Sequence, residues 1–160
     1  MQSIVRLLLC LAVACGTAAA QTAPARVKAQ MLYLPVYSHV YHGDLDSKGA
    51  PVRSLVSVLV SIRNTDPARP IRVMSAQYYD TDGKKLKEYV TAPKLIGPMG
   101  THEVYIPTSD TSGGSGANFV VSWQADTPVN PPIVEGLHLN LTSMGRSIAF
   151  MTQAREISAQ

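Results

Sequence analysis

Hydrophobic and polar residues alternate along most of this chain, which is the pattern of a β-strand with one buried face. The clearest case is residues 55–63, where Val56, Val58, Val60 and Ile62 fall on one face. Their β-branched side chains favour strands because they pack well on a pleated surface. No ten-residue stretch carries a helical period, so the pattern predicts an all-β protein.

Turn signals separate these alternating segments. The strongest is Asp80–Gly83, because an Asp-Gly pair supplies the positive φ that tight hairpin turns need. Pro35 interrupts the first segment, which is therefore expected to be an edge strand or to contain a bulge. The predicted strands are 31–37, 55–63, 71–80, 84–90, 102–106, 118–125, 133–141 and 147–152. About eight short strands at this spacing predict an antiparallel β-sandwich of immunoglobulin-like type, with a small β-barrel as the alternative.

The alternation also predicts which face of each strand is buried. In residues 118–125, Trp123 alternates into the core together with Phe119 and Val121. In residues 133–141, His138 falls on the face opposite the leucines and is expected to be exposed. The apolar stripe assigned to the core there is Ile133, Leu137, Leu139 and Leu141.

The first twenty residues have the features of a signal peptide. Arg6 is their single charge, the apolar run from Leu7 to Ala14 is too short to span a membrane, and small residues follow it. The expected organisation is a signal peptide at 1–20, a flexible leader at 21–29 and one β-sandwich domain at 30–156.

Both cysteines, Cys10 and Cys15, lie in this predicted signal peptide. Its removal leaves a mature chain with no disulfide, no thiolate nucleophile and no cysteine-based metal site. An alternative remains open, because Ala12–Cys15 resembles a bacterial lipobox in which Cys15 would be lipidated. The expected location is therefore the periplasm or the exterior, or the membrane surface if the chain is a lipoprotein.

Composition and charge narrow the class of protein. The chain has 160 residues, of which 46% are hydrophobic and 16% charged, which suits one domain with a sizeable core. The formal net charge is +3, and the only basic cluster is Lys84, Lys85 and Lys87, just after a predicted turn. Scattered charge without a nucleic-acid-binding motif indicates no nucleic-acid partner.

Five sequence blocks carry a resemblance to a known family. The most specific is residues 109–119, SDTSGGSGANF, and the others are 34–43, 61–66, 78–80 and 129–133. Together they resemble the family called domain of unknown function 3124, found in exported bacterial proteins and lipoproteins. The resemblance runs from about Met31 to Arg155. It implies a location in the bacterial cell envelope and no particular activity, cofactor or partner.

The glycine-rich part of that block is the first candidate binding surface. Three glycines within four residues allow the backbone to aim several N–H groups at one anion. The same composition suits an ordered corner in which Asp110 and Asn118 cap the backbone. No lysine follows in the manner of a phosphate loop. The candidate ligand contacts are Asp110, Ser112, Gly113, Gly114, Ser115, Gly116 and Asn118.

Two catalytic interpretations of this loop fail. Residues 110–113 carry one residue too many for the Asp-Thr-Gly of aspartic proteases, and there is no second copy to complete a carboxylate pair. Residues 113–117 resemble a nucleophile elbow, but a strand follows instead of a helix, and nothing places a histidine beside Ser115. No enzymatic activity is expected.

A metal site is the alternative. His39 and His42 are three residues apart, so on a straight strand they face opposite ways and converge only if the chain bends at Gly43–Asp44. With His102 or methionine side chains they would offer the donors that suit copper. No other cofactor is expected.

The function expected from the sequence is that of a non-enzymatic cell-envelope domain that binds a ligand or a protein partner. Two alternatives stay open. One is periplasmic binding of copper or another metal through His39 and His42. The other is a structural accessory of an envelope complex.

Overall fold

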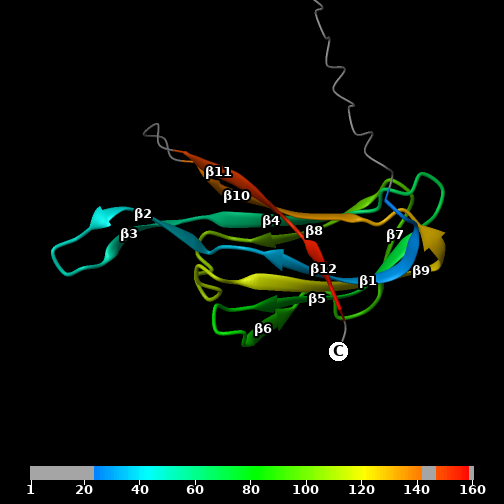
Figure 1. Cartoon of the computed structure of the whole chain (residues 1–160), viewed down its shortest axis with the longest axis horizontal. Coiled ribbons are helices and arrows are strands. Elements are labelled where there is room, and N and C mark those ends of the chain that lie inside the picture. Colours follow the sequence, from blue (N-terminus) through cyan, green and yellow to red (C-terminus); the bar gives the residue numbers. More distant parts are fainter. Residues whose placement is uncertain (1–23, 142–146, 159–160) are drawn as a thin grey trace, which may run out of the picture.

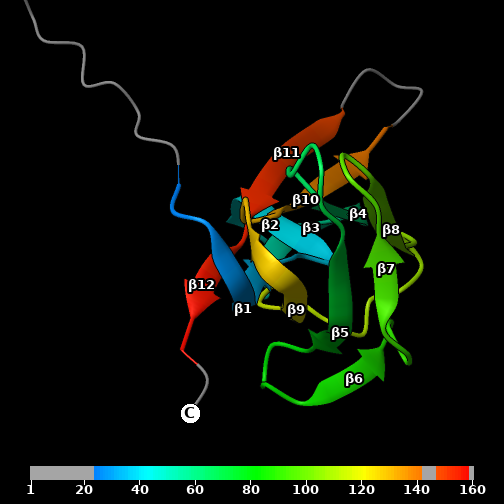
Figure 2. The ribbon, with the colours of Figure 1, turned by 90° about the vertical axis from the view of Figure 1, so that its right-hand side faces the viewer.

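The computed structural model describes residues 24–141 and 147–158, and the regular structure in them is β-strand. Two antiparallel sheets form separate layers, and a two-stranded hairpin projects from one end (Figures 1 and 2). The predicted all-β sandwich is confirmed. The described strands do not close into a barrel, so the barrel alternative is wrong.

The larger sheet has the order β12-β1-β9-β5-β6, and β7 also pairs with β5. β9 is its central strand and pairs with β1 on one side and with β5 on the other along most of its length. β1 lies between β12 and β9 and has a register shift between Val27 and Ala29, so of the two expectations for this strand the bulge is found and the edge is not. Pro35 is tolerated because it is the last residue of β1. The bounds are β1 Val27–Pro35, β5 Ile71–Tyr79, β6 Lys85–Glu88, β7 Lys94–Ile96, β9 Asn118–Val129 and β12 Arg155–Ile157.

The smaller sheet has four strands in the order β11-β10-β4-β8. Its inner face covers the larger sheet, and its outer face points away from the sandwich (Figure 1). The bounds are β4 Ser57–Arg63, β8 Thr101–Ile106, β10 Ile133–Asn140 and β11 Ile148–Gln153.

The third element is a hairpin of β2 His39–Leu45 and β3 Pro51–Leu55, here called the arm. Its turn is closed by Asp46, whose Oδ1 accepts the backbone N–H groups of Lys48 and Ala50 at 2.8 and 2.9 Å. β2 and β3 pack mainly against each other, and the arm extends beyond the ends of the neighbouring strands at the left of Figure 1. The predicted strand 55–63 is thus β4 together with the last residue of β3.

The core lies between the two sheets and follows the predicted alternation. The inner positions of β4 are fully buried, as are Phe119 and Trp123 of β9. Each such side chain contributes roughly 1.5–3 kcal/mol by leaving water, which is the main force holding the layers together. The inward-facing residues here are Val58, Val60 and Ile62 of β4, together with Val56 just before the strand.

A buried polar corner closes one end of the sandwich. The Asn64 side chain is 2% exposed and donates to the carbonyl oxygens of Arg69, Ile96 and Gly97. Asp66 accepts the backbone N–H groups of Arg69 and Asn130 at 3.0 and 3.2 Å. Two of the sequence blocks that carry the family resemblance, 61–66 and 129–133, therefore meet here to satisfy buried backbone groups.

One predicted face is wrong. The apolar stripe predicted to be buried faces outward, since Ile133 at the start of β10 is 48% exposed and Leu141 just after the strand is 73% exposed, whereas His138 is fully buried. The strand carries apolar residues on both faces, so alternation alone does not decide which face is inside. His138 faces inward because its ring stacks on Phe150 at 4.4 Å between centroids and its Nε2 accepts the backbone N–H of Tyr37 at 3.2 Å.

The predicted boundaries need one further correction. Residues 27–29, assigned to a flexible leader, begin β1 and pair with β9 through Val27 and Val129. The predicted signal peptide at 1–20, with Cys10 and Cys15, lies outside the described residues. Within the described ranges there is no helix of the length and apolar character needed to cross a membrane.

Candidate functional site

The glycine-rich loop and the base of the arm meet at Ser38, so two surfaces chosen separately from the sequence are adjacent. The backbone N–H of Ser38 donates to the carbonyl oxygen of Gly114 at 2.9 Å, and its hydroxyl lies 3.3 Å from that of Tyr78. Its carbonyl accepts the N–H of Val56 at 3.0 Å. We call Ser38, Tyr78, Thr81, Gly113 and Gly114 the Ser38 corner.

The glycines of this corner are needed for close packing. A Cβ on Gly113 would collide with the hydroxyl of Tyr78, which is 1% exposed and has no room to move. Gly114 has a φ of 77° and lies against the Thr81 hydroxyl. Both features demand glycine, the first by close approach and the second by left-handed backbone.

Polar groups of the loop bind to one another and to Thr81. The N–H of Gly116 donates to Thr81 Oγ1 at 3.0 Å, and the N–H of Ser112 donates to Asp110 Oδ1 at 3.0 Å. The N–H of Thr81 in turn donates to the carbonyl of Gly113 at 3.0 Å. These bonds favour the interpretation of the loop as an ordered corner over that of an anion-binding nest.

The remaining loop candidates lie at its margins. Ser115 is partly exposed beside Gly116, and Asn118 is the first residue of β9, paired with Pro35 on one side and Tyr79 on the other. Burial raises the pKa of Tyr78, with Asp110 adding to the effect, so the Tyr78 hydroxyl stays protonated and able to donate. The hydrogen bonds of the Ser38 corner therefore hold the glycine-rich loop against the base of the arm.

The structure keeps His39 and His42 apart. The pairing of β2 with β3 is regular from His39 to His42, so the two side chains face opposite sides of the arm. The bend expected at Gly43, which has a φ of 71°, comes after His42 and does not bring the rings together. His42 Nε2 lies 2.8 Å from the Ser54 hydroxyl instead.

His102 lies at the far end of the smaller sheet. It pairs with Ile62, whereas His39 pairs with Leu55, so about seven strand residues, or roughly 23 Å, separate the two. Burial lowers the pKa of His102. In the described part of the chain, no group of three or more metal-ligating side chains is assembled.

His39 instead packs at the base of the arm. It is 6% exposed, its ring meets that of Tyr41 edge-on at 4.9 Å, and neither of its nitrogens has a hydrogen-bond partner among the described residues. Burial lowers the pKa of His39 and the nearby Arg53 lowers it further. In this position the neutral imidazole packs against the Tyr41 ring in a T-shaped contact.

The arm exposes large apolar side chains that the sequence interpretation did not single out. Tyr41, Leu45 and Val52 are 54%, 65% and 50% exposed. Tyr41 pairs directly with Arg53, which is also exposed, so the two share one face. The sequence could have predicted this hairpin from the Asp46–Gly49 turn, which separates two short segments of alternating polar and apolar residues.

A second apolar surface crosses the outer face of the smaller sheet. The register places one residue from each strand in a continuous line, because Leu137 pairs with both Met151 and Leu59, and Leu59 pairs with Tyr105. Met151 and Tyr105, at its ends, are 55% and 60% exposed. We call these four residues the apolar row. The sequence interpretation missed it because it assigned the leucines of β10 to the core.

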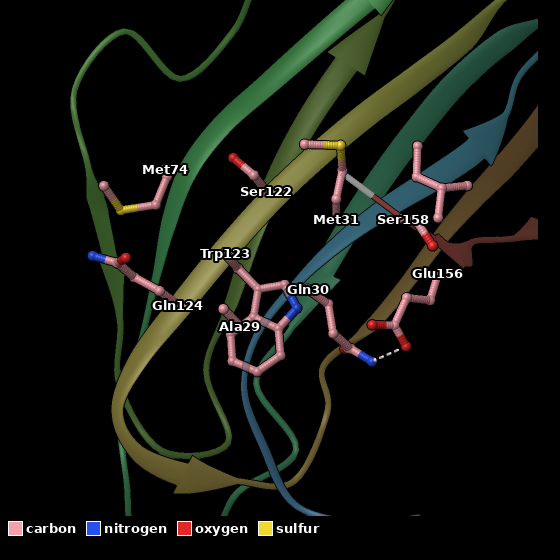
Figure 3. Close-up of a pocket in the computed structure, with 10 residues that line it drawn as sticks. Ala29, Gln30, Met31, Met74, Ser122, Trp123, Gln124, Glu156 and Ser158 are labelled. Carbon is pink, nitrogen blue, oxygen red and sulfur yellow. Dashed lines mark hydrogen bonds between the residues drawn. The ribbon is translucent and has the colours of Figure 1, made fainter. Parts of the chain in front are cut away.

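A shallow groove of about 490 Å³ lies over β9 in the larger sheet. Figure 3 shows Met31 and Met74 on either side of Ser122, with Gln30 donating to Glu156 at 2.9 Å nearby. The groove is wide open and mixed in polarity. Its lining brings together no set of side chains that specifies one ligand.

Comparisons with known proteins support the family and no activity. The family model described as "Protein of unknown function (DUF3124)" matches residues 29–157. No curated protein matches the chain. A solved structure described as "Crystal Structure of Thermotoga maritima 1070" is similar at 10% identity with a TM-score of 0.42, covering 80% of this chain and 94% of that one.

Proposed function

We propose, from the premise that this chain belongs to the DUF3124 family of proteins of unknown function, that it is a non-enzymatic binding module of the cell envelope. It engages a protein partner through the arm. The observation that carries the proposal is that the arm leaves the sandwich with Tyr41, Leu45 and Val52 at least half exposed.

The energetics of a hairpin support this role. An isolated two-stranded hairpin is marginally stable in water, so an arm that exposes apolar surface gains stability from a covering partner. Its base is fixed by the Ser38 corner and by the amide of Asn140, which donates to the carbonyl of Leu55 at 2.6 Å. A rigid base lowers the entropy lost on binding.

The chemistry of the arm suits a protein more than a small molecule. Tyrosine and arginine are the side chains most often responsible for binding energy at protein interfaces, and Tyr41 and Arg53 lie side by side here. Small ligands require a concave lining, and the grooves described over β9 and beside β10 are lined by none of the arm residues.

Two sequence features support the envelope location and one structural feature supports a non-enzymatic role. The first twenty residues have the pattern of a signal peptide, and the family resemblance is to exported proteins. The polar groups of the glycine-rich loop bind one another and Thr81 of the Ser38 corner. A metal role through His39 and His42 has less support, since their side chains face opposite sides of the arm.

Site-specific photocrosslinking tests the proposal. A photoreactive amino acid replaces Tyr41 in the full chain, expressed in a bacterium that carries it naturally, and the control replaces Lys84, an exposed residue of the β5–β6 turn that lies outside the arm. The expected result is a discrete crosslinked protein at position 41 and none at 84. Loss of that product in Leu45→Ser/Val52→Ser supports the arm, and crosslinking equal at both positions contradicts it.

A further inference from the structure

We propose that the partner of the arm is a second copy of this chain, and this rests on the proposed function. In the resulting two-fold dimer, the arm of each chain lies across the apolar row of the other. The row is Met151, Leu137, Leu59 and Tyr105. Each chain therefore contributes its arm to one contact and its apolar row to the other.

Within the described residues, the arm has no route to cover the apolar row of its own chain. β3 continues into β4 through Val56, whose N–H is held by the carbonyl of Ser38, so the arm prolongs the direction of β4. Figure 1 shows it leaving the sandwich along the strands, away from the outer face of the smaller sheet. Folding the arm back would break the bonds of the Ser38 corner. Among the residues that the structure describes, both apolar surfaces of one chain therefore remain exposed.

The dimensions of the two surfaces match. Four strands spaced at about 4.8 Å make the apolar row roughly 15–19 Å long, and the five residues of β3 extend for about 17 Å. A ribbon laid across strands at a steep angle is an established way for β-sheets to pack. The arm therefore spans the row from the Tyr105 end to the Met151 end.

The buried area suits a weak dimer that needs both contacts. A ribbon face about 17 Å long and 10 Å wide covers about 170 Å² of each surface, or about 340 Å² over both, and two-fold symmetry provides the contact twice. The sum of about 700 Å² is below the size of stable complexes and is in the range of weak, transient protein–protein contacts. One contact alone would have half of this area, which favours the reciprocal arrangement.

The charges next to the two apolar surfaces are complementary. Arg53 lies beside Tyr41 on the arm, and Glu103 lies two residues before Tyr105 on the same outer face of β8. Both are exposed, and neither forms an ion pair within the described residues. The other carboxylate at the row, Glu135, is already bound to Arg63 at 2.7 Å. Arg53 of one chain is thus positioned to pair with Glu103 of the other.

The primary experiment measures the mass of the full chain in solution by sedimentation over a dilution series. The expected species is a dimer that dissociates into monomers on dilution. The arm variant Tyr41→Ser/Leu45→Ser and the row variant Tyr105→Ser/Met151→Ser are each expected to weaken dimerisation at least about 30-fold. Leu95→Ser, at a residue of β7 that is 57% exposed, is the matched control and keeps the wild-type constant. Unchanged circular dichroism shows that each variant is folded.

Mixing the two variants distinguishes arm-on-row contacts from other dimers. The arm variant keeps an intact row, and the row variant keeps an intact arm, so their mixture regains one good contact and forms heterodimers at lower concentration than either variant forms homodimers. Arm-on-arm or row-on-row dimers would gain nothing from mixing, and that result would overturn the proposal.

A charge exchange gives an independent check. Arg53→Glu and Glu103→Arg each place like charges together and weaken the dimer, whereas the double variant restores the pair with reversed polarity. Failure of the double variant to recover would contradict the assigned contact. A monomeric wild-type chain that still crosslinks to a different protein at position 41 would overturn the dimer and leave the proposed function standing. A monomer without any crosslink would overturn both.

Discussion

The backbone N–H of Tyr37 donates to Nε2 of His138 at 3.2 Å, although 101 residues separate them in the chain. The bond fixes the acceptor nitrogen, and the ring is held between Tyr37 edge-on and Phe150 in parallel. Burial lowers the pKa of His138 from 6.5 to about 4, so the buried imidazole is neutral at neutral pH.

This burial predicts a loss of stability in mild acid. The pKa of His138 is lower in the folded chain than in the unfolded chain. At pH values between these two pKa values, His138 is protonated in the unfolded chain and neutral in the folded chain. Stability therefore falls as the pH falls from about 6.5 toward 4, by roughly 2 kcal/mol at pH 5 for this residue. Urea unfolding at pH 7.5 and pH 5 measures the difference.

The control for this prediction is His138→Gln, which keeps an acceptor for Tyr37 but does not titrate. Its stability is expected to be lower than wild type at pH 7.5 and to change less between the two pH values. Equal pH dependence in both proteins would assign the effect to other groups.

Gly113→Ala is expected to destabilise the fold by on the order of 3 kcal/mol, because the added methyl group meets the Tyr78 hydroxyl in a closed corner. Thermal unfolding provides the measurement. Gly97→Ala is the matched control, since a Cβ there meets nothing within 4 Å. Tyr78→Phe removes the clashing oxygen, so the double variant Gly113→Ala/Tyr78→Phe should lose less than the sum of the singles. Strict additivity would contradict the assigned clash.

Asn64→Leu is expected to cost about 3 kcal/mol. The amide bridges the carbonyl oxygens of Arg69, Ile96 and Gly97, and a side chain of similar size without donors leaves these three acceptors without that partner. Denaturant unfolding compares it with Gln153→Leu at an exposed position of β11. A loss no greater than that of the control would show that water replaces the amide.

Copper and zinc are expected to bind the chain weakly, and His39→Ala/His42→Ala is expected to leave that binding unchanged. The reason is geometric, since the two rings lie on opposite faces of the arm and His102 is roughly 23 Å from His39 along the sheet. Calorimetric titration of both proteins measures it. Tight stoichiometric binding that the double variant loses would restore the metal hypothesis and require the arm to rearrange.

Much of the architecture was accessible from local pattern. The buried face from Val56 to Ile62 is as the alternation predicted, and the Asp80–Gly83 turn forms with Gly83 at a φ of 79°. The glycine-rich loop was rightly recognised as a special backbone segment. Its role as the anchor of the arm was not predictable, because that role depends on Tyr78 and Thr81, which approach it only in the folded chain.

The sequence alone determined the β-class, the principal strands and most of the core, because burial on one side of a strand imposes a period of two on its own residues. The tertiary structure decided which face of β10 is inside, that β3 departs from the sheet as an arm, and that His39, His42 and His102 stay apart. Each of these outcomes depends on contacts with residues that are far away in the sequence. Val134 and Leu137 are both apolar, and only the arrival of Tyr37 and Phe150 against His138 selects between the two faces.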